Sequence, residues 1–177
     1  MEAKIYVGTY GKYNNGSLFG QWIDLTKHED KAAFVKACKQ LHKGEHDPEY
    51  MYQDYEGILT DMPQTWISES HLSEQVFEFI EHYKDDKEEK GEAFLNWLSN
   101  VGYTGDFDYL VGEFDEAYVG KYDNEKAYAE HLADEMGFYA AMEKAGINTA
   151  YFDEEAYARD LFMSDYNYMG GVVFRNI

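Results

Sequence analysis

Cysteine and proline are nearly absent from this sequence of 177 residues, which contains one Cys and two Pro. The solitary Cys38 excludes a disulfide framework within the chain and is typical of a reducing compartment. No apolar run approaches the roughly 20 residues that a membrane-spanning helix requires. The start, MEAKIYVGTY, lacks the basic and apolar regions of a signal peptide. These absences predict a cytoplasmic protein that does not enter a membrane.

Basic residues are also scarce, because 15 Lys and Arg stand against 35 Asp and Glu, for a formal net charge of -20. Such a surface cannot neutralise phosphate, so we expect no direct binding to nucleic acid and a basic partner instead. The acids are concentrated late in the chain, since residues 1–43 carry a net +3 and residues 44–177 a net -23. Aromatic residues make up 18% of the chain and supply the apolar area for folding.

The hydrophobic pattern predicts an α+β protein of three small domains, the first of which spans residues 1–62. Alternating residues predict strands at 4–10 and 18–25, joined by a tight hairpin turn at Asn15-Gly16. A helix is expected at about 29–42, followed by a return strand or irregular segment at 49–58. The first domain is therefore expected to combine a sheet with a helix.

The pattern of residues 63–103 predicts an entirely helical second domain. One helix is expected from a cap at Ser70 to Tyr83. After the charged segment KDDKEEKGE, a second helix is expected to turn Phe94, Trp97, Leu98 and Val101 inward and to end at Gly102.

Residues 104–177 predict a third, mixed α/β domain. Its first part, DFDYLVGEFDEAYVGKYDN, combines strand-like and turn-like pieces. A helix follows at 124–136, with Ala127, Tyr128, Leu132 and Met136 on its apolar stripe. A further helix is expected at about 153–162, and GGVVFRNI predicts a final strand.

The motifs that could indicate catalysis or metal binding do not meet the structural requirements of those functions. The segment His42-Lys43-Gly44-Glu45-His46 has the H-x-x-E-H pattern of some zinc peptidases, but that pattern requires a continuous helix. Gly44 and Pro48 predict a helix end, so we interpret this segment as a solvated helix end. Pairs of carboxylates arise by chance among 35 acids. The sequence therefore predicts no catalytic residue, no metal and no cofactor.

The run from Asp106 to Asp165 contains sixteen acids and four bases. On the helix predicted at 124–136 the only base is Lys126, although an ordinary solvated helix interleaves Lys or Arg four residues from each acid. A solvated face and a surface charged like DNA both remain open at this point. The candidate partner-binding residues are the acids Asp106, Asp108, Glu113, Asp115, Glu116, Asp123, Glu125, Glu130, Asp134, Glu135, Asp153, Glu154 and Glu155.

Three stretches resemble the ArdA antirestriction proteins. They are IYVGTYGKYNNGSLFGQWIDL, FDEAYVGKYDNEKAYAEHLADEMG and YFDEEAYARDLF. The second is similar to the acidic signature of that family. Its matching positions are Glu116, Tyr118, Val119, Gly120, Tyr128, Ala129 and Glu130. The resemblance runs over nearly the whole chain, although residues 63–101 match only in helical, acidic character.

The resemblance implies an elongated chain of three small domains that forms a homodimer shaped and charged like bent duplex DNA. Such a dimer occupies the DNA site of type I restriction-modification enzymes and catalyses nothing itself. The dimer contact implied by the family involves Tyr118, Val119, Gly120 and Tyr122. Two alternatives remain open: an acidic mimic directed at a different DNA-binding protein, and a carboxylate-dependent hydrolase.

Overall fold

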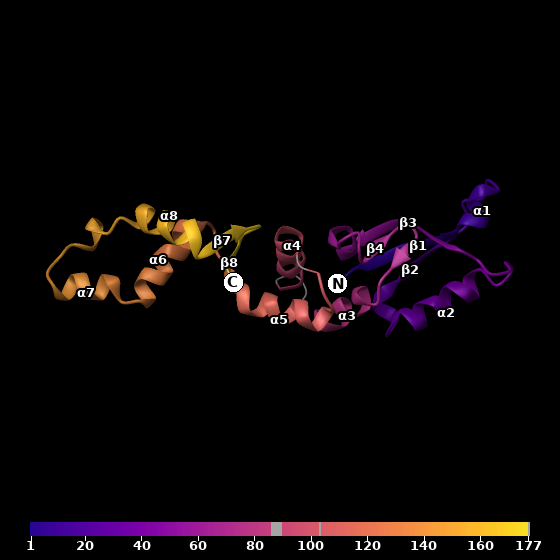
Figure 1. Cartoon of the computed structure of the whole chain (residues 1–177), viewed down its shortest axis with the longest axis horizontal. Helices are drawn as coiled ribbons and strands as arrows, with labels where there is room; N and C mark the ends of the chain where they lie inside the picture. The colour runs from indigo at the N-terminus through magenta and orange to yellow at the C-terminus, as the bar shows by residue number, and fades with distance from the viewer. Residues whose placement is uncertain (86–89, 103, 177) are drawn as a thin grey trace. The chain divides into compact units, whose positions relative to one another are not determined.

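The structure is a computed structural model whose described residues are 1–85, 90–102 and 104–176 (Figure 1). The chain divides into two compact units, Met1–Leu110 and Val111–Ile177. Each unit combines helices with antiparallel strands, which confirms the predicted α+β class. The predicted boundary after residue 62 lies inside the first unit, and the division into three domains stays a prediction. Within the described residues, no helix is long and apolar enough to cross a membrane.

The first unit begins with a three-stranded sheet in the order β2-β1-β3. Its strands are β1 (Ala3–Thr9), β2 (Gln21–Asp24) and β3 (Tyr50–Gly57), and both pairings are antiparallel. Alternate β1 side chains are fully buried, as the sequence pattern predicts. Helix α2 (Lys31–Leu41) begins at its cap Asp30, which accepts a hydrogen bond from the backbone N–H of Ala33 at 2.7 Å.

The connection between β1 and β2 differs from the predicted two-residue turn. A short helix, α1 (Tyr10–Asn14), follows β1 directly and is capped by Thr9. Gly16 has a φ of +78° and donates its N–H to the carbonyl of Tyr13 at 2.9 Å. The Asn-Gly pair therefore ends a helix, as left-handed glycines commonly do, and does not form a hairpin turn.

The rest of the first unit packs around an aromatic core. Its elements are η1 (Leu25–Lys27), η2 (Ile58–Asp61), β4 (Ile67–Ser68), β5 (His71–Leu72), α3 (Gln75–His82) and α4 (Glu92–Val101). Trp66 contacts the rings of Phe79, Phe94 and Phe107 at centroid distances of 6.1–6.4 Å. Many such tilted and edge-to-face contacts stabilise the packing of these short helices.

Several predictions for this region are wrong in detail. It contains the β4–β5 hairpin, so it is not entirely helical. Helix α3 begins at Gln75, whose N–H is bound by Ser73 at 3.3 Å, so Ser70 is not its cap. Val101 is 37% exposed because it lies at the helix end, whereas Gly102 closes α4 with a φ of +68° as predicted. Residues 86–89 of the charged segment lie outside the described residues.

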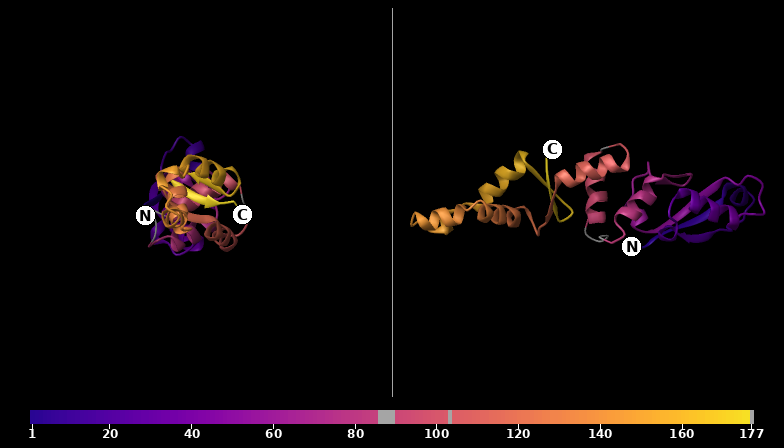
Figure 2. Two further views of the ribbon diagram at one scale, coloured as in Figure 1. Left: turned by 90° about the vertical axis from the view of Figure 1, so that its left-hand side faces the viewer. Right: turned by 90° about the horizontal axis from the view of Figure 1, so that it is seen from below.

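The second unit consists of helices and a three-stranded antiparallel sheet in the order β6-β8-β7. Its elements are α5 (Phe107–Ala117, which begins in the first unit), β6 (Tyr118–Lys121), α6 (Glu125–Glu135), α7 (Phe138–Lys144), η4 (Thr149–Tyr151), α8 (Glu154–Ser164), β7 (Tyr166–Met169) and β8 (Val172–Arg175). Helix α8 packs against α6, and Figures 1 and 2 show α7 at the end of this pair that lies away from the sheet. The predicted helices at 124–136 and 153–162 and the final strand are confirmed.

The predicted mixture of strand and turn over residues 106–124 is wrong, because α5 occupies most of it. Phe107, Leu110, Phe114 and Ala117 recur at helical spacing and are all buried. Met136 is a second error, since it is 59% exposed directly after the end of α6. The structure also has a strand that the pattern did not predict, β7, which pairs with β8 across Gly170-Gly171, both at positive φ.

Candidate partner-binding surface

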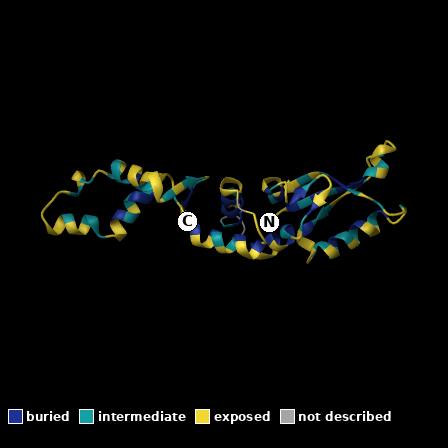
Figure 3. Cartoon of the chain, viewed as in Figure 1, coloured by how far each residue is buried: buried dark blue, intermediate teal, exposed yellow. Residues whose placement is uncertain are grey.

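Helices α6 and α8 carry the largest group of predicted partner-binding acids. Tyr128, Ala129 and Ala133 of α6 are buried, and so is Ala158 of α8, which leaves the other faces of both helices to solvent. In Figure 3 these outer faces are exposed or half-buried. The predicted acids that are exposed on or beside the two helices are Asp123, Glu125, Asp134, Glu135, Asp153 and Glu155. The fold therefore turns these carboxylates toward solvent rather than toward a core.

Lys126 is the one basic residue on α6, apart from His131. Its ammonium group lies 3.2 Å from Glu154 and 3.6 Å from Glu130. The hydrogen bond from Lys126 is the main reason that the pKa of Glu154 is lowered, and Tyr139 donates a further bond to the same carboxylate at 3.2 Å. Glu130 and Glu154 are both half-buried in this cluster, and the lowered pKa of Glu154 favours its ionised form.

Other acids of this surface have no such compensation. His131 lies 3.6 Å from Glu135, a contact that is an ion pair only when the imidazole is protonated. Within the described chain, Glu125 and Asp134 take part in no ion pair. Residues 111–177 contain 14 acids and 5 bases, a net charge of -9. The surface therefore keeps an excess of negative charge that its own bases do not neutralise.

Helix α5 carries the remaining five predicted acids. Glu113, Asp115 and Glu116 lie off the buried face and belong to the second unit. Asp106 and Asp108 belong to the first unit and are exposed, and Asp106 caps the helix by accepting the Tyr109 N–H at 2.9 Å. Of the thirteen predicted acids none is buried, and only Glu113, Glu130 and Glu154 are half-buried.

Two acids that the sequence interpretation missed lie near Asp106 and Asp108. They are Glu74 and Glu78, at the start of α3 and both exposed. The pKa of Glu78 is raised, first by burial and then by the charges of Glu74, Asp108 and Asp106. The first unit therefore brings four carboxylates together from segments about 30 residues apart. No periodicity within either segment indicates this cluster.

The predicted dimer residues lie on and after strand β6. Tyr118 pairs with Phe174 of β8 and Gly120 with Val173, and the register shifts between them at Val119. Tyr122 continues the pairing through its N–H, which donates to the carbonyl of Gly171 at 3.0 Å. All four predicted residues are half-buried. Among the described strands β6 pairs only with β8, so it forms one edge of its sheet.

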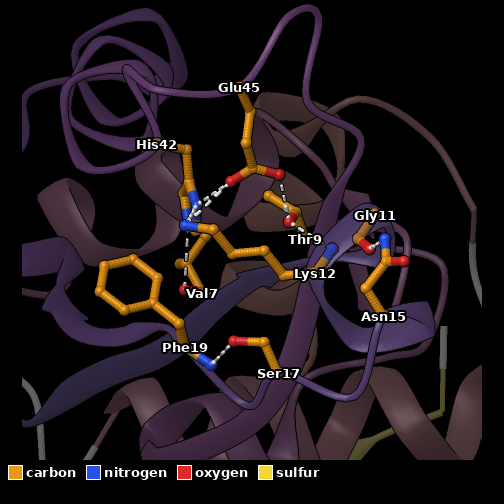
Figure 4. Close-up of polar contacts among 9 residues, drawn as sticks. All are labelled: Val7, Thr9, Gly11, Lys12, Asn15, Ser17, Phe19, His42 and Glu45. Atoms are coloured by element: carbon orange, nitrogen blue, oxygen red, sulfur yellow. Dashed lines mark hydrogen bonds and ion pairs between the residues drawn. The ribbon is translucent and has the colours of Figure 1, made fainter.

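The H-x-x-E-H segment forms a polar cluster that is not a solvated helix end (Figure 4). His42 is 1% exposed, its Nδ1 lies 2.8 Å from Glu45 Oε1, and its Nε2 lies 3.4 Å from the Val7 carbonyl. Glu45 also accepts from Thr9 Oγ1 at 2.7 Å and pairs with Lys12 Nζ at 3.0 Å. Both imidazole nitrogens therefore face protein atoms, which leaves neither free to act on a substrate.

The cluster also provides no metal site. His46 is exposed and is not among the contacts of His42 and Glu45. Throughout residues 1–85, 90–102 and 104–176, no three His, Cys, Asp or Glu side chains are grouped so as to hold a metal ion. The arrangement is that of a structural polar network in which each donor meets an acceptor.

These features define an acidic α+β protein whose candidate site is a charged surface on helices. In a comparison with known families, residues 5–174 match the family described as antirestriction protein (ArdA). The chain therefore belongs to the ArdA antirestriction family. A search of curated proteins gives no match.

Proposed function

We propose that this protein inhibits type I restriction-modification enzymes by occupying their DNA-binding groove with its carboxylates, without catalysis and without a cofactor. The observation that carries the proposal is the exposed, undercompensated acid surface of α6 and α8, where Glu125 and Asp134 have no ion pair within the described chain. Family membership gives antirestriction as the biological role. In this proposal the exposed acids perform that role by taking the place of DNA phosphates.

The mechanism follows from the electrostatics of DNA recognition. Duplex DNA carries one charge per ~1.7 Å of its axis, and a DNA-binding groove places Lys and Arg to meet these charges. Carboxylates held on helices are already ordered, so their docking requires neither the ordering of a flexible chain nor the bending of DNA. We therefore expect fast association at low salt and weaker binding as salt rises.

The proposal includes a homodimer in the cytoplasm, with contact through Tyr118, Val119, Gly120 and Tyr122. The edge position of β6 among the described strands supports this choice, because an edge strand can offer backbone N–H and C=O groups to a second copy. The half-buried side chains would lose further exposed area on pairing. The elongated, three-domain organisation implied by the family is part of the same proposal.

The hydrolase alternative requires a carboxylic acid that donates a proton, and such an acid has a raised pKa. In the second unit Glu154 shows the opposite, because the hydrogen bond from Lys126 lowers the pKa of its carboxyl. In DNA mimicry the free energy of binding is spread over many carboxylates, each of which contributes modestly. A substitution series separates the two mechanisms.

The test measures DNA cleavage by a type I restriction enzyme in the presence of increasing amounts of the protein. We expect stoichiometric inhibition that excess unmodified duplex DNA relieves. Single changes such as Glu125→Gln should weaken inhibition less than about threefold, and the triple change of Glu125, Asp134 and Glu155 to their amides by about tenfold or more. Amide changes at the exposed acids Glu29, Glu49 and Asp61 serve as the matched control.

Two outcomes would count against the proposal. Inhibition that is substoichiometric or indifferent to competing DNA would exclude occupation of the groove. Complete loss of activity on one single substitution would favour the hydrolase. If no restriction enzyme binds, but a different DNA-binding protein is captured and is released by DNA, the mimic has another target.

A further inference from the structure

Helix α2 has a basic outer face in a chain that is otherwise strongly acidic. Residues 31–44 contain Lys31, Lys36, Lys39 and Lys43 and no Asp or Glu. Lys36, Lys39 and Lys43 are exposed, and within the described chain none of the three takes part in an ion pair. Residues 44–110 of the same unit contain 17 acids and 3 bases. The face is therefore a local exception to the charge of its own unit.

An open groove lies between this helix and strand β2. It has a volume of about 640 Å³ and is lined by Gln21, Trp22, Ile23, Asp24, Lys27, His28, Ala37, Gln40 and Leu41. That volume falls within the ~300–1,000 Å³ typical of ligand clefts. The indole of Trp22 is 40% exposed although its edge contacts Tyr6 at a centroid distance of 5.5 Å. An aromatic ring that is held in place but half uncovered is a ready contact for an apolar side chain.

Strand β2 forms one wall of the groove and is an edge strand. Among the described strands it pairs only with β1, and all four of its residues line the groove. Its other side therefore has backbone N–H and C=O groups for an added strand over a length of about 13 Å, at ~3.3 Å per residue. The place of β2 beside α2 is visible in Figure 1.

Two lysines flank the groove on the side of helix α2. Lys36 lies one helical turn before the lining residue Gln40, and Lys43 lies three residues after it, so both flank the groove. Lys27 lines the groove and pairs at 3.4 Å with Asp24, which is the one acid among the lining residues. Among the described residues Lys36 and Lys43 have no ion-pair partner, which favours a ligand with negative charge.

We propose that the groove between β2 and α2 binds an extended acidic segment of a partner protein, which adds to the sheet as a strand beside β2. Backbone pairing with β2 provides the affinity, Trp22 contacts an apolar side chain of the segment, and Lys36 and Lys43 pair with its carboxylates. A nucleic acid also carries negative charge, but it lacks the alternating N–H and C=O groups that an edge strand binds. This binding site is independent of the proposed acid surface.

The test uses the full chain and a fluorescein-labelled twelve-residue peptide of alternating Glu and Val. Binding is measured by fluorescence anisotropy at low salt, and the position of binding is followed with unlabelled peptide through acrylamide quenching of tryptophan. Trp66 and Trp97 are 3% and 2% exposed, so the quenchable fluorescence belongs mainly to Trp22. We expect saturable binding that protects Trp22 from acrylamide.

Two matched controls make the test specific. Lys36→Glu should weaken binding about tenfold, whereas Lys39→Glu, next to Gln40 but turned about 100° from it on the helix, should change binding less than twofold. The same peptide N-methylated at two consecutive residues in every four keeps its charge but loses half of the N–H donors on each of its edges, and it should also bind at least tenfold more weakly. Circular dichroism confirms that both variants are folded.

Several results would overturn the proposal. They are the absence of measurable binding, equal binding of the N-methylated peptide, equal binding of an alternating Lys-Val peptide, and equal effects of the two lysine changes. Tighter binding of a single-stranded oligonucleotide at this groove would show that its ligand is a nucleic acid and not a protein segment. If restriction inhibition fails while peptide binding succeeds, only the proposed function is lost, because the two surfaces are assayed separately.

Discussion

The carboxylate of Glu45 lies 2.8 Å from Nδ1 of His42, whose side chain is completely buried. A carboxylate can only accept a hydrogen bond, so Nδ1–H donates in this pair. Thr9 donates to the other carboxylate oxygen, and Lys12 covers the site with its ammonium group 3.7 Å from the ring centre of Phe19. Glu45 thus joins the end of β1, helix α1 and the turn after α2.

Removal of this carboxylate should destabilise the protein. Glu45→Ala leaves the buried His42 and the hydroxyl of Thr9 without their partner, and we expect the free energy of unfolding to fall by about 2 kcal/mol. Urea unfolding followed by circular dichroism measures the change. Glu49→Ala, at an exposed site nearby, is the control and should stay within about 0.5 kcal/mol of the original. Equal effects of the two changes would show that the cluster does not stabilise the fold.

The same cluster should make stability depend on pH. Burial raises the pKa of Glu45, but hydrogen bonds from Thr9, Lys12 and His42 outweigh it, and the folded-state pKa lies below the ordinary value of 4.5. A lowered folded-state pKa stabilises the protein above the unfolded-state pKa, and that contribution is lost as pH falls through the folded-state value. The difference in unfolding free energy between the original protein and Glu45→Gln should therefore shrink below about pH 4.5. A difference that is constant from pH 7 to pH 3 would contradict this explanation.

The sequence predicts elements well where one local pattern decides the structure. Alternating residues predict β1, and the stripe with Tyr128 predicts α6 because that residue is buried against its neighbours. Helix α5 is predicted wrongly because Tyr109, Val111 and Gly112 favour strands or turns locally. Burial of Phe107 and Phe114 at helical spacing overrides that preference, and only the folded chain shows which residues surround them.

The candidate sites, too, can be predicted only where one local pattern decides the structure. Exposure of the acids on α6 and α8 can be predicted, because an acid off the apolar stripe of a helix faces solvent. The burial of His42 cannot be predicted, since its contact with Val7 joins residues that are 35 positions apart. The proximity of Glu78 to Asp106 and Asp108 cannot be predicted from the sequence either, because it depends on how α3 packs beside the start of α5.

The acidic cluster of the first unit should cost stability at neutral pH. The pKa of Glu78 is raised by burial and by the charges of Glu74, Asp108 and Asp106. A carboxyl whose folded-state pKa is raised destabilises the fold once it ionises, so the penalty is present above the folded-state pKa and disappears below the unfolded-state value. Glu78→Gln should therefore stabilise the protein at pH 7 by at most about 0.5 kcal/mol, because the site is exposed.

The measurement compares urea midpoints of Glu78→Gln and the original protein at pH 7 and pH 3.5. The gain should be present at pH 7 and absent at pH 3.5. Glu2→Gln is a control outside the cluster, since Glu2 pairs with Lys4 at 2.6 Å, and it should not stabilise the protein. A Glu78→Gln variant that is less stable at pH 7 would show that the carboxylate makes a favourable contact.

A charge placed on the edge of β6 should prevent dimer formation if the second unit pairs there. Val119 is half-buried at the bulge of this edge strand, so an aspartate in its place would be desolvated or repelled by its copy in a dimer. We expect Val119→Asp to shift the protein from dimer to monomer in sedimentation velocity at micromolar concentration. Asn167→Asp adds the same charge at an exposed position of β7, at the opposite edge of the same sheet, and should leave the dimer intact. If Asn167→Asp dissociates the dimer and Val119→Asp does not, the interface lies at β7, and the β6 contact is wrong.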